Sequence, residues 1–244
     1  MRQFKRRRGR FLTNVGDYLA AIRDPQAHEP MVDAVALLRE FVPWSRSLGG
    51  SAFEEGRPWI TFEAARLLEA TITPASRVFE YGSGGSTVFL AERCAEVVSV
   101  EHDPKWFDVV RGAVEGRPGL RFELVQPRPV ATKADAAVTS TVPEFAGVTF
   151  ADYVGVIDGY PDHHFDVLVI DGRARPSCFF RGQPKVRDGG LVILDDSERP
   201  AYRDVLAAAR SAGWVERGRL GPKPFSIRFS RTTVWTKTRD LDRR

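Results

Sequence analysis

Residues 77–103 read RVFEYGSGGSTVFLAERCAEVVSVEHD, in which two short apolar runs flank a glycine-rich turn and a helical segment. The runs at residues 77–80 and 97–101 predict strands, and residues 86–94 predict the helix between them. A strand, a helix and a second strand in this order form a unit whose two strands are parallel. The stretch therefore predicts an α/β protein.

The same alternation of short apolar runs and helical segments continues toward the C-terminus. We expect further strands over residues 120–125, 165–170 and 191–194, helical segments over 104–114, 150–157, 177–187 and 202–209, and a long loop over 127–147. The last two extended segments, 214–219 and 226–236, have no helix between them, so they should pair antiparallel. The sequence predicts a doubly wound, mostly parallel sheet with an antiparallel C-terminal hairpin.

The chain is expected to divide into three parts. Residues 1–29 are predicted to be a flexible basic tail, because the first 16 residues hold six basic side chains and no acid. Residues 30–76 are predicted to be a helical segment that packs on the core, with one helix ending at Pro43 and a second capped by Thr61. Residues 77–238 are predicted to form the α/β domain itself.

The composition is that of an ordinary globular protein. The 244 residues are 43% hydrophobic and 28% charged, which excludes a collagen, a coiled coil, a disordered chain and a disulfide scaffold. Cys94 and Cys178 are too few for a disulfide framework and do not form a C-x-x-C pair. No apolar stretch typical of a signal peptide follows the basic start, and no apolar run of about 18 residues is present. We expect a cytoplasmic protein.

Acidic side chains follow four of the five predicted parallel strands. Glu80 ends the first strand, Glu101 ends the second, Asp171 follows the fourth, and Asp195 and Asp196 follow the fifth. In doubly wound sheets, ligands bind at this carboxyl edge of the strands. Acids without a function would not be expected to concentrate there, so the edge is the predicted site.

The glycine-rich turn at residues 82–85 allows a tight bend and the close approach of a ligand to the backbone. Glu101 lies 19 residues after Gly82, at a spacing suited to binding the two hydroxyls of a ribose. A pyrophosphate is disfavoured, because Thr87 stands where a dinucleotide-binding turn has its third glycine and because Glu80 would repel a phosphate. The residues predict a nucleoside that carries positive charge.

These motifs, EYGSGGST at residues 80–87 and VSVEHD at residues 98–103, resemble those of the class I S-adenosylmethionine-dependent methyltransferases. The family motif is an acid followed by x-G-x-G-x-G, with a second acid at the end of the next strand. Ser86 stands here in place of the third glycine. The resemblance covers about residues 57–237, and within the family the chain resembles small bacterial O-methyltransferase-like members.

The resemblance implies a seven-stranded Rossmann-like sheet, S-adenosylmethionine as the cofactor and a methyltransferase activity carried by residues 77–238. It also implies which residues would bind the methyl donor. Glu101 would hold the ribose, and Asp171 would be a further contact of the donor. The methionine end would be lined by Glu80, Gly82, Gly84 and Ser86.

The methyl acceptor is predicted to be an oxygen atom. Residues 171–175 read DGRAR, not the N/D-P-P-Y/F motif of relatives that methylate amines or amides, and Asn14 is the only asparagine. Cys178 lies in a predicted helix and is poorly placed to be the nucleophile that carbon methylation of pyrimidines uses. O-methylation of a small-molecule or sugar hydroxyl remains, with Asp171 or Asp195 as the general base.

Asp171, Asp195 and Asp196 could together bind Mg²⁺, because carboxylate oxygens suit this ion. Their arrangement resembles that of metal-dependent O-methyltransferases that act on catechols or macrolide sugars, in which the metal holds and acidifies the acceptor hydroxyl. Metal-free members of the family carry acids at the same positions, where the acids contact donor or acceptor. Both possibilities stay open at this point.

Two further groups of side chains are predicted near the site. Trp59 precedes the second helix, and in similar sequences this segment packs beside the donor pocket. Three arginines follow the fourth strand and could clamp an acidic acceptor: Arg173, Arg175 and Arg181.

Other functions compete with a small-molecule or saccharide methyltransferase. An RNA methyltransferase would use the basic tail, and its binding would fall steeply with salt. The net charge is +4 and the first 16 residues contribute six positive charges, so the remainder carries −2, which disfavours a nucleic-acid partner. A non-catalytic scaffold subunit would bind the donor without turnover. A nicotinamide dehydrogenase is disfavoured, because the glycine-rich turn at residues 82–85 does not suit a pyrophosphate. The sequence is also compatible with a homodimer.

Overall fold

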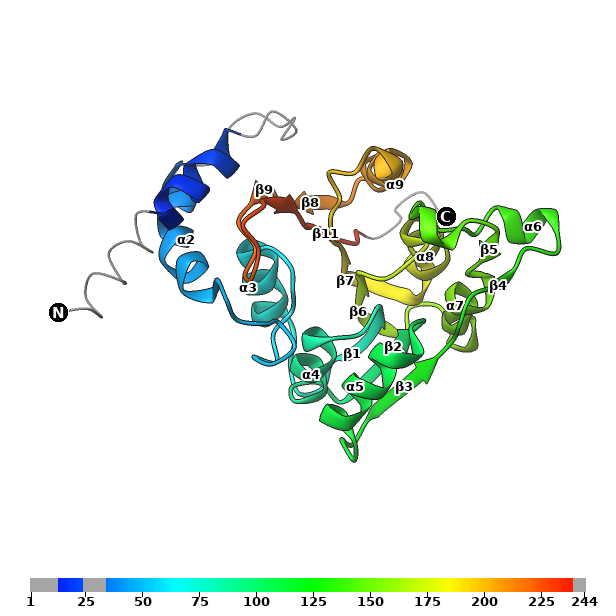
Figure 1. Cartoon of the computed structure of the whole chain (residues 1–244). Coiled ribbons are helices and arrows are strands. Elements are labelled where there is room, and N and C mark those ends of the chain that lie inside the picture. The colour runs from blue at the N-terminus through cyan, green and yellow to red at the C-terminus, as the bar shows by residue number, and fades with distance from the viewer. Residues whose placement is uncertain (1–12, 24–33, 239–244) are drawn as a thin grey trace.

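The computed structural model describes residues 13–23 and 34–238, in which a sheet lies between two layers of helices (Figure 1). The basic side chains of the first 10 residues, on which the prediction of a tail depends, lie outside the described residues. The helices are α2 (Ala34–Ser47), α3 (Phe62–Thr71), α4 (Gly85–Ala91), α5 (Pro104–Val114), α6 (Lys133–Ala136), α7 (Ala151–Gly155), α8 (Arg175–Gly182) and α9 (Arg203–Ser211). The strands are β1 (Arg77–Tyr81), β2 (Glu96–Glu101), β3 (Leu120–Leu124), β4 (Arg128–Pro129), β5 (Val148–Thr149), β6 (Phe165–Ile170), β7 (Val186–Leu194), β8 (Val215–Arg217), β9 (Leu220–Gly221), β10 (Ser230–Arg231) and β11 (Thr233–Thr236).

The main sheet has seven strands in the order β3-β2-β1-β6-β7-β11-β8. The five strands from β3 to β7 are parallel, and β11 is antiparallel to both β7 and β8. The prediction of a doubly wound sheet with an antiparallel C-terminal hairpin is confirmed. The chain builds outward from β1 to β3 and then returns to add β6 on the other side of β1. The switch point therefore lies between β1 and β6, where a ligand crevice is expected.

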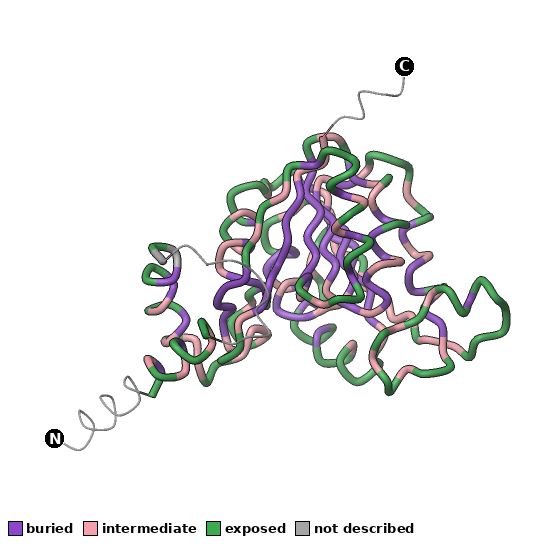
Figure 2. Tube along the Cα trace, turned by 90° about the horizontal axis from the view of Figure 1, so that it is seen from above, coloured by how far each residue is buried: buried purple, intermediate pink, exposed green. Residues whose placement is uncertain are grey.

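The core consists of two apolar layers, one on each face of the sheet. The central strands between them are buried along most of their length (Figure 2). Phe79 and Tyr81 of β1 belong to the layer under α7, α8 and α9, whereas Val78 belongs to the layer under α3 and α4. Side chains alternate between the two faces of a strand, so a strand covered on both faces must be apolar throughout. This explains the continuous apolar runs of the sequence.

The N-terminal segment differs from the prediction in two places. Residues 13–22, which the prediction assigned to the tail, form a helix whose Tyr18 is buried against Trp44 of α2. Pro43 does not end α2, which continues to Ser47. The indole of Trp44 is fully buried and its Nε1 donates to the carbonyl of Ser226 at 2.6 Å. Tertiary packing of the residue after Pro43 thus outweighs the lost backbone hydrogen bond.

Other helix boundaries follow the sequence signals. The side chain of Thr61 caps α3 by accepting from the N–H of Ala64, and Pro104 stands in the first turn of α5. The strand predicted at residues 191–194 is longer and begins at Val186, so α8 ends sooner than predicted. Over the residues described, no helix is both long and apolar enough to cross a membrane.

Candidate active site

A cavity of about 690 Å³ lies at the carboxyl ends of β1, β2, β6 and β7. The loop between β9 and β10, residues 222–229, and Trp59 from the N-terminal segment contribute to its wall. Its carboxylates are Glu101, Asp103, Glu144, Asp171, Asp195, Asp196 and Glu198, and its cationic side chains are Arg173, Arg175, Arg199, Lys223 and Arg228. The edge of the sheet that the sequence indicated is therefore hollow and strongly charged.

The glycine turn forms one side of the cavity at the switch point. Gly82 follows β1 with a φ of +92°, a conformation that favours glycine, and it lines the cavity. Its N–H donates to the carbonyl of Val100, and the N–H of Asp171 donates to the carbonyl of Tyr81, both at 2.9 Å. These backbone contacts fix Gly82 and Asp171 side by side at the ends of neighbouring strands.

Glu80 lies behind the turn and does not line the cavity. Its Oε2 accepts hydrogen bonds from the hydroxyls of Thr87 (2.6 Å) and Ser99 (2.7 Å), while its buried Oε1 has no hydrogen-bond partner among the described residues. Burial raises the pKa of Glu80 to about 6, although the hydrogen bonds from Thr87 and Ser99 oppose the shift. Gly84 and Ser86 also do not line the cavity.

Glu101 lines the cavity at the end of β2, and its carboxylate is held by the turn. Its Oε2 accepts from the N–H and the hydroxyl of Ser83 at 3.1 and 2.7 Å. Its Oε1 accepts from the backbone N–H groups of His102 and Asp103 at 2.7 and 2.9 Å. Burial opposes ionisation, but the imidazole of His102, whose Nδ1 lies 2.8 Å from Oε1, and the hydrogen bonds from Asp103 and Ser83 lower the pKa of Glu101 to about 2. The group is a preorganised anion.

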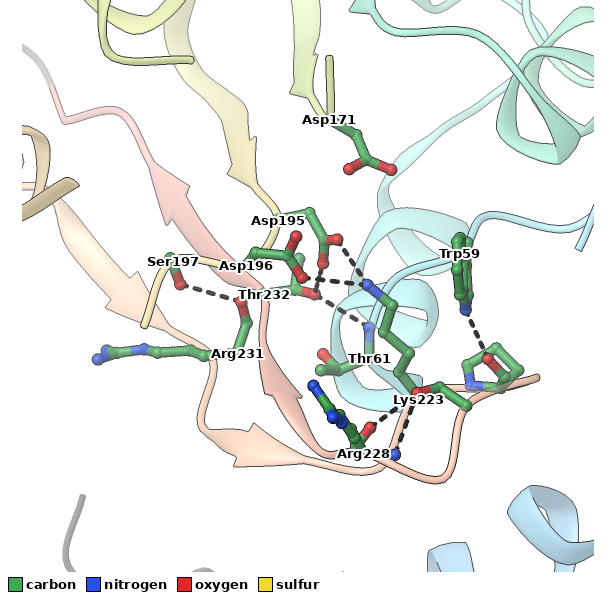
Figure 3. A network of polar contacts seen from close by, with 12 residues as sticks. Trp59, Thr61, Asp171, Asp195, Asp196, Ser197, Lys223, Arg228, Arg231 and Thr232 are labelled. Carbon is green, nitrogen blue, oxygen red and sulfur yellow. Dashed lines mark hydrogen bonds and ion pairs between the residues drawn. The ribbon is translucent and has the colours of Figure 1, made fainter. Parts of the chain in front are cut away.

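Asp195 and Asp196 follow β7 and bind the ammonium group of Lys223, as Figure 3 shows. The Nζ of Lys223 lies 2.8 Å from Oδ2 of Asp195 and 3.3 Å from Oδ1 of Asp196. The hydroxyl of Thr232 donates to Oδ1 of Asp195 at 2.6 Å, so both oxygens of this carboxylate are engaged. Although burial opposes it, the two carboxylates raise the pKa of Lys223 above its ordinary value. Lys223 is therefore a buried cation.

Asp171 is the acid of this group that remains open to the cavity. Its Oδ1 lies 2.9 Å from the guanidinium of Arg175, and no described residue forms a hydrogen bond with its Oδ2. The side chain is 27% exposed, whereas that of Asp195 is 1% exposed. Desolvation at the cavity floor and the carboxylate of Asp195 raise the pKa of Asp171 to about 7, although Arg175 and Lys223 oppose the shift. Asp171 therefore holds a proton more readily than an ordinary aspartate.

The residues do not fit the Mg²⁺ ion predicted at Asp171, Asp195 and Asp196. Lys223 already lies between Asp195 and Asp196, and the guanidinium of Arg175 contacts Asp171 at 2.9 Å and Asp196 at 3.5 Å. Within the described part of the chain, no group of three or more acidic, histidine or cysteine side chains is arranged to hold a metal. The structure corrects this prediction, because side-chain cations take the place that the metal would need.

The predicted arginine clamp separates into three different environments. Arg173 lines the cavity, whereas Arg175 is 5% exposed and also donates to the carbonyls of Gly172, Asp195 and Asp171. Arg181 does not line the cavity and pairs with Asp158 instead.

Lys223 is one of the site residues that the sequence prediction missed. It stands between two prolines in the connection Gly221-Pro222-Lys223-Pro224, and lysine supplies few of the 36 basic residues of this chain. The only feature of the sequence that could have indicated Lys223 is a lysine, rare in this chain, held between two prolines. Phe145 was also missed, because it lies in the segment predicted as a long loop; its ring contacts that of His102 at the cavity wall.

Comparisons with known proteins bear on the fold. No model of a known protein family matches the chain. A ribosomal protein L11 methyltransferase of Symbiobacterium thermophilum is 30% identical over 115 residues, which is 46% of this chain. The match covers 35% of that relative, so this chain spans about a third of its length. The solved structure of an rRNA methylase from Streptococcus thermophilus has 13% identity and a TM-score of 0.50, over 72% of this chain and 95% of that one.

The likeness to the solved structure concerns the fold. The described chain has the Rossmann-like fold of class I methyltransferases, with the antiparallel strand β11 between β7 and β8. Its cavity lies at the switch point where that fold binds ligands.

Proposed function

We propose that this chain is an S-adenosylmethionine-dependent methyltransferase that methylates a hydroxyl group of a small molecule or saccharide. The observation that carries the proposal is the position of Asp171. Asp171 lines the cavity beside Gly82, at the switch point of a methyltransferase fold, and among the described residues only its Oδ1 has a side-chain partner. A proton acceptor placed there suits an acceptor that must lose a proton when it is methylated.

The cavity has groups that suit the donor. S-adenosylmethionine, when bound, supplies an electrophilic methyl group on a positively charged sulfur. The ionised carboxylate of Glu101 would accept hydrogen bonds from the ribose hydroxyls, and Gly82 would allow the backbone to approach the ligand closely. The seven carboxylates of the cavity wall would favour a cationic ligand over a pyrophosphate.

The acceptor hydroxyl would donate its hydrogen bond to Oδ2 of Asp171. As the acceptor oxygen gains its methyl group, that carboxylate would take the proton, so no free alkoxide needs to form. Asp195 is less suited to this role, because Lys223 and Thr232 already occupy both of its oxygens. Asp195 would instead hold the ammonium group of Lys223 in position near Asp171.

A nucleic-acid acceptor is the alternative, and the names of the two similar proteins refer to rRNA and to a ribosomal protein. The wall of this cavity carries seven carboxylates against five cationic side chains. A phosphate backbone would meet repulsion there, so the cavity favours a small hydroxyl acceptor.

Calorimetric titration of the purified full chain tests the donor. We expect saturable binding of S-adenosylmethionine and of its demethylated product, weakened about 10- to 100-fold in Glu101→Ala, and no binding of NAD. Lys133→Ala is a matched control, because α6 contributes no lining residue to the cavity. A preference for NAD, or no binding of either donor form, would contradict the proposal.

An acceptor screen then tests the reaction. Hydroxyl compounds and a short RNA are incubated with the donor, and the demethylated product is measured. We expect turnover with a hydroxyl compound, a loss of about 100-fold or more in Asp171→Asn, and donor binding close to wild type in that variant. Donor binding without turnover on any acceptor would favour the scaffold function instead.

A further inference from the structure

The ammonium group of Lys223 is held in place from several directions. It contacts Asp195 and Asp196, and it lies 4.9 Å from the centre of the Trp59 ring. Aromatic faces attract cations, so the ring adds a third favourable contact. The residue is 7% exposed.

The loop that carries Lys223 is anchored to the N-terminal segment. The indole Nε1 of Trp59 donates to the carbonyl of Pro224 at 2.8 Å, and the N–H of Phe62 donates to the carbonyl of Pro222 at 3.3 Å. The prolines on both sides of Lys223 restrict its backbone. The ammonium group is therefore positioned by the backbone as well as by its charge partners.

The charges of the group balance only when the lysine is present. Three carboxylates, Asp171, Asp195 and Asp196, meet three side-chain cations, Arg175, Arg199 and Lys223. Removal of one partner from a buried ion pair leaves an uncompensated charge and is strongly destabilising. Without Lys223, the three carboxylates would outnumber the two remaining cations, Arg175 and Arg199, and Asp195 would lose its ammonium partner.

We propose that Lys223 is a built-in replacement for a divalent metal ion and that this site works without one. It is a positioning residue, because it fixes Asp195 and Asp196 beside Asp171 through their oxygens. The catalytic part of this inference rests on the proposed function, whereas the ion-binding part does not. A metal would have to displace the ammonium from the same oxygens, so one cation excludes the other.

Manganese binding is the direct test. Mn²⁺ is titrated into the full chain and free Mn²⁺ is followed by electron paramagnetic resonance. We expect no saturable site in the wild type and at least about tenfold tighter binding in Lys223→Met, which has a similar length but no charge. The added Asp195→Asn change should abolish the gained site. A saturable site in the wild type that Asp195→Asn removes would overturn the proposal.

Thermal unfolding gives a second readout that does not depend on activity. We expect Lys223→Met to lower the midpoint, and either Asp195→Asn in the same chain or added Mn²⁺ to restore part of the loss. Lys185→Met with Asp162→Asn is the matched control, since that pair lies at 2.8 Å but Asp162 is 60% exposed, so its coupling should be close to zero. The proposal would be refuted if Lys223→Met left the unfolding midpoint unchanged. It would also be refuted if neither Asp195→Asn nor added Mn²⁺ restored any of the lowered midpoint.

The two proposals fail in different ways. Absence of donor binding in the wild type would reject the methyltransferase function and leave the manganese and unfolding results to decide the role of Lys223. If turnover is found, chelation with EDTA should leave its rate unchanged, and a loss that Mg²⁺ restores would overturn the inference about Lys223 alone.

Discussion

The hydroxyl of Tyr153 lies where a side chain on Gly172 would begin: a Cβ at that position would be 2.0 Å from the Tyr153 Oη. Tyr153 comes from α7, and Gly172 comes directly after Asp171 at the end of β6. A buried tyrosine on one face of the sheet therefore restricts the backbone on which the proposed base depends.

The first prediction concerns this contact. Gly172→Ala should destabilise the fold by about 1–3 kcal/mol, because the added methyl group has no space, and should weaken donor binding. Gly112→Ala is the control, since nothing lies within 4 Å of its Cβ position in α5 and alanine is the better helix former. Denaturant unfolding measures both. Equal stabilities for the two variants would show that the turn tolerates a side chain.

The second prediction concerns Glu101 and the free energy of unfolding at acid pH. The folded-state pKa of Glu101 is about 2, below the ordinary value of 4.5, so its ionised form stabilises the fold. This contribution should be present above about pH 4.5 and should be lost as the pH falls from there toward 2. Unfolding free energies of the wild type and Glu101→Gln should converge over this range. A constant difference between them at all pH values would argue against the prediction.

The third prediction concerns Asp171, whose shift has the opposite sign. Its pKa is raised from 3.8 to about 7, so the proton is held more tightly in the folded state. Its contribution to stability should be greatest below pH 3.8 and should fall as the pH rises from there to about 7. Turnover should rise over the upper part of that range, because the base acts when ionised.

Asp171→Asn removes both dependences in this prediction. The variant should lose turnover. Its free energy of unfolding should also lack the decrease between pH 4 and pH 7 that the wild type shows. Donor titration in parallel separates a loss of chemistry from a loss of binding. A pH–rate profile without a rise near neutrality would exclude Asp171 as the base.

The fourth prediction concerns the hydroxyl of Thr232, which donates to Asp195 and accepts from the N–H of Thr61 at 3.0 Å. Thr232→Val should cost about 1–3 kcal/mol, because two buried polar groups lose their partner. Thr71→Val is the matched control, since its hydroxyl is exposed and donates only to the carbonyl of Leu67. Its effect should stay within about 0.5 kcal/mol. Thermal unfolding distinguishes the two.

The sequence predicts the parallel part of the sheet well, because each signal there is local. The apolar run at residues 165–170 is buried on both faces as expected, and Gly82 takes the left-handed conformation that its glycine-rich context indicated. The boundary at Pro43 was wrong, because the packing of Trp44 involves Ser226, which is 182 residues away. Periodicity carries no information about such partners.

The sequence alone placed acids at the ends of strands and therefore located the cavity, since strand ends are defined by the local pattern of apolar residues. It did not determine what those acids bind. Asp171, Asp195 and Asp196 are equally consistent with a metal and with side-chain cations until Arg175 and Lys223 are placed. Lys223 reaches Asp195 from 28 residues further along the chain, after β8 has added to the far edge of the sheet. Electrostatic pairing depends on distance in space, and only the tertiary structure fixes that distance.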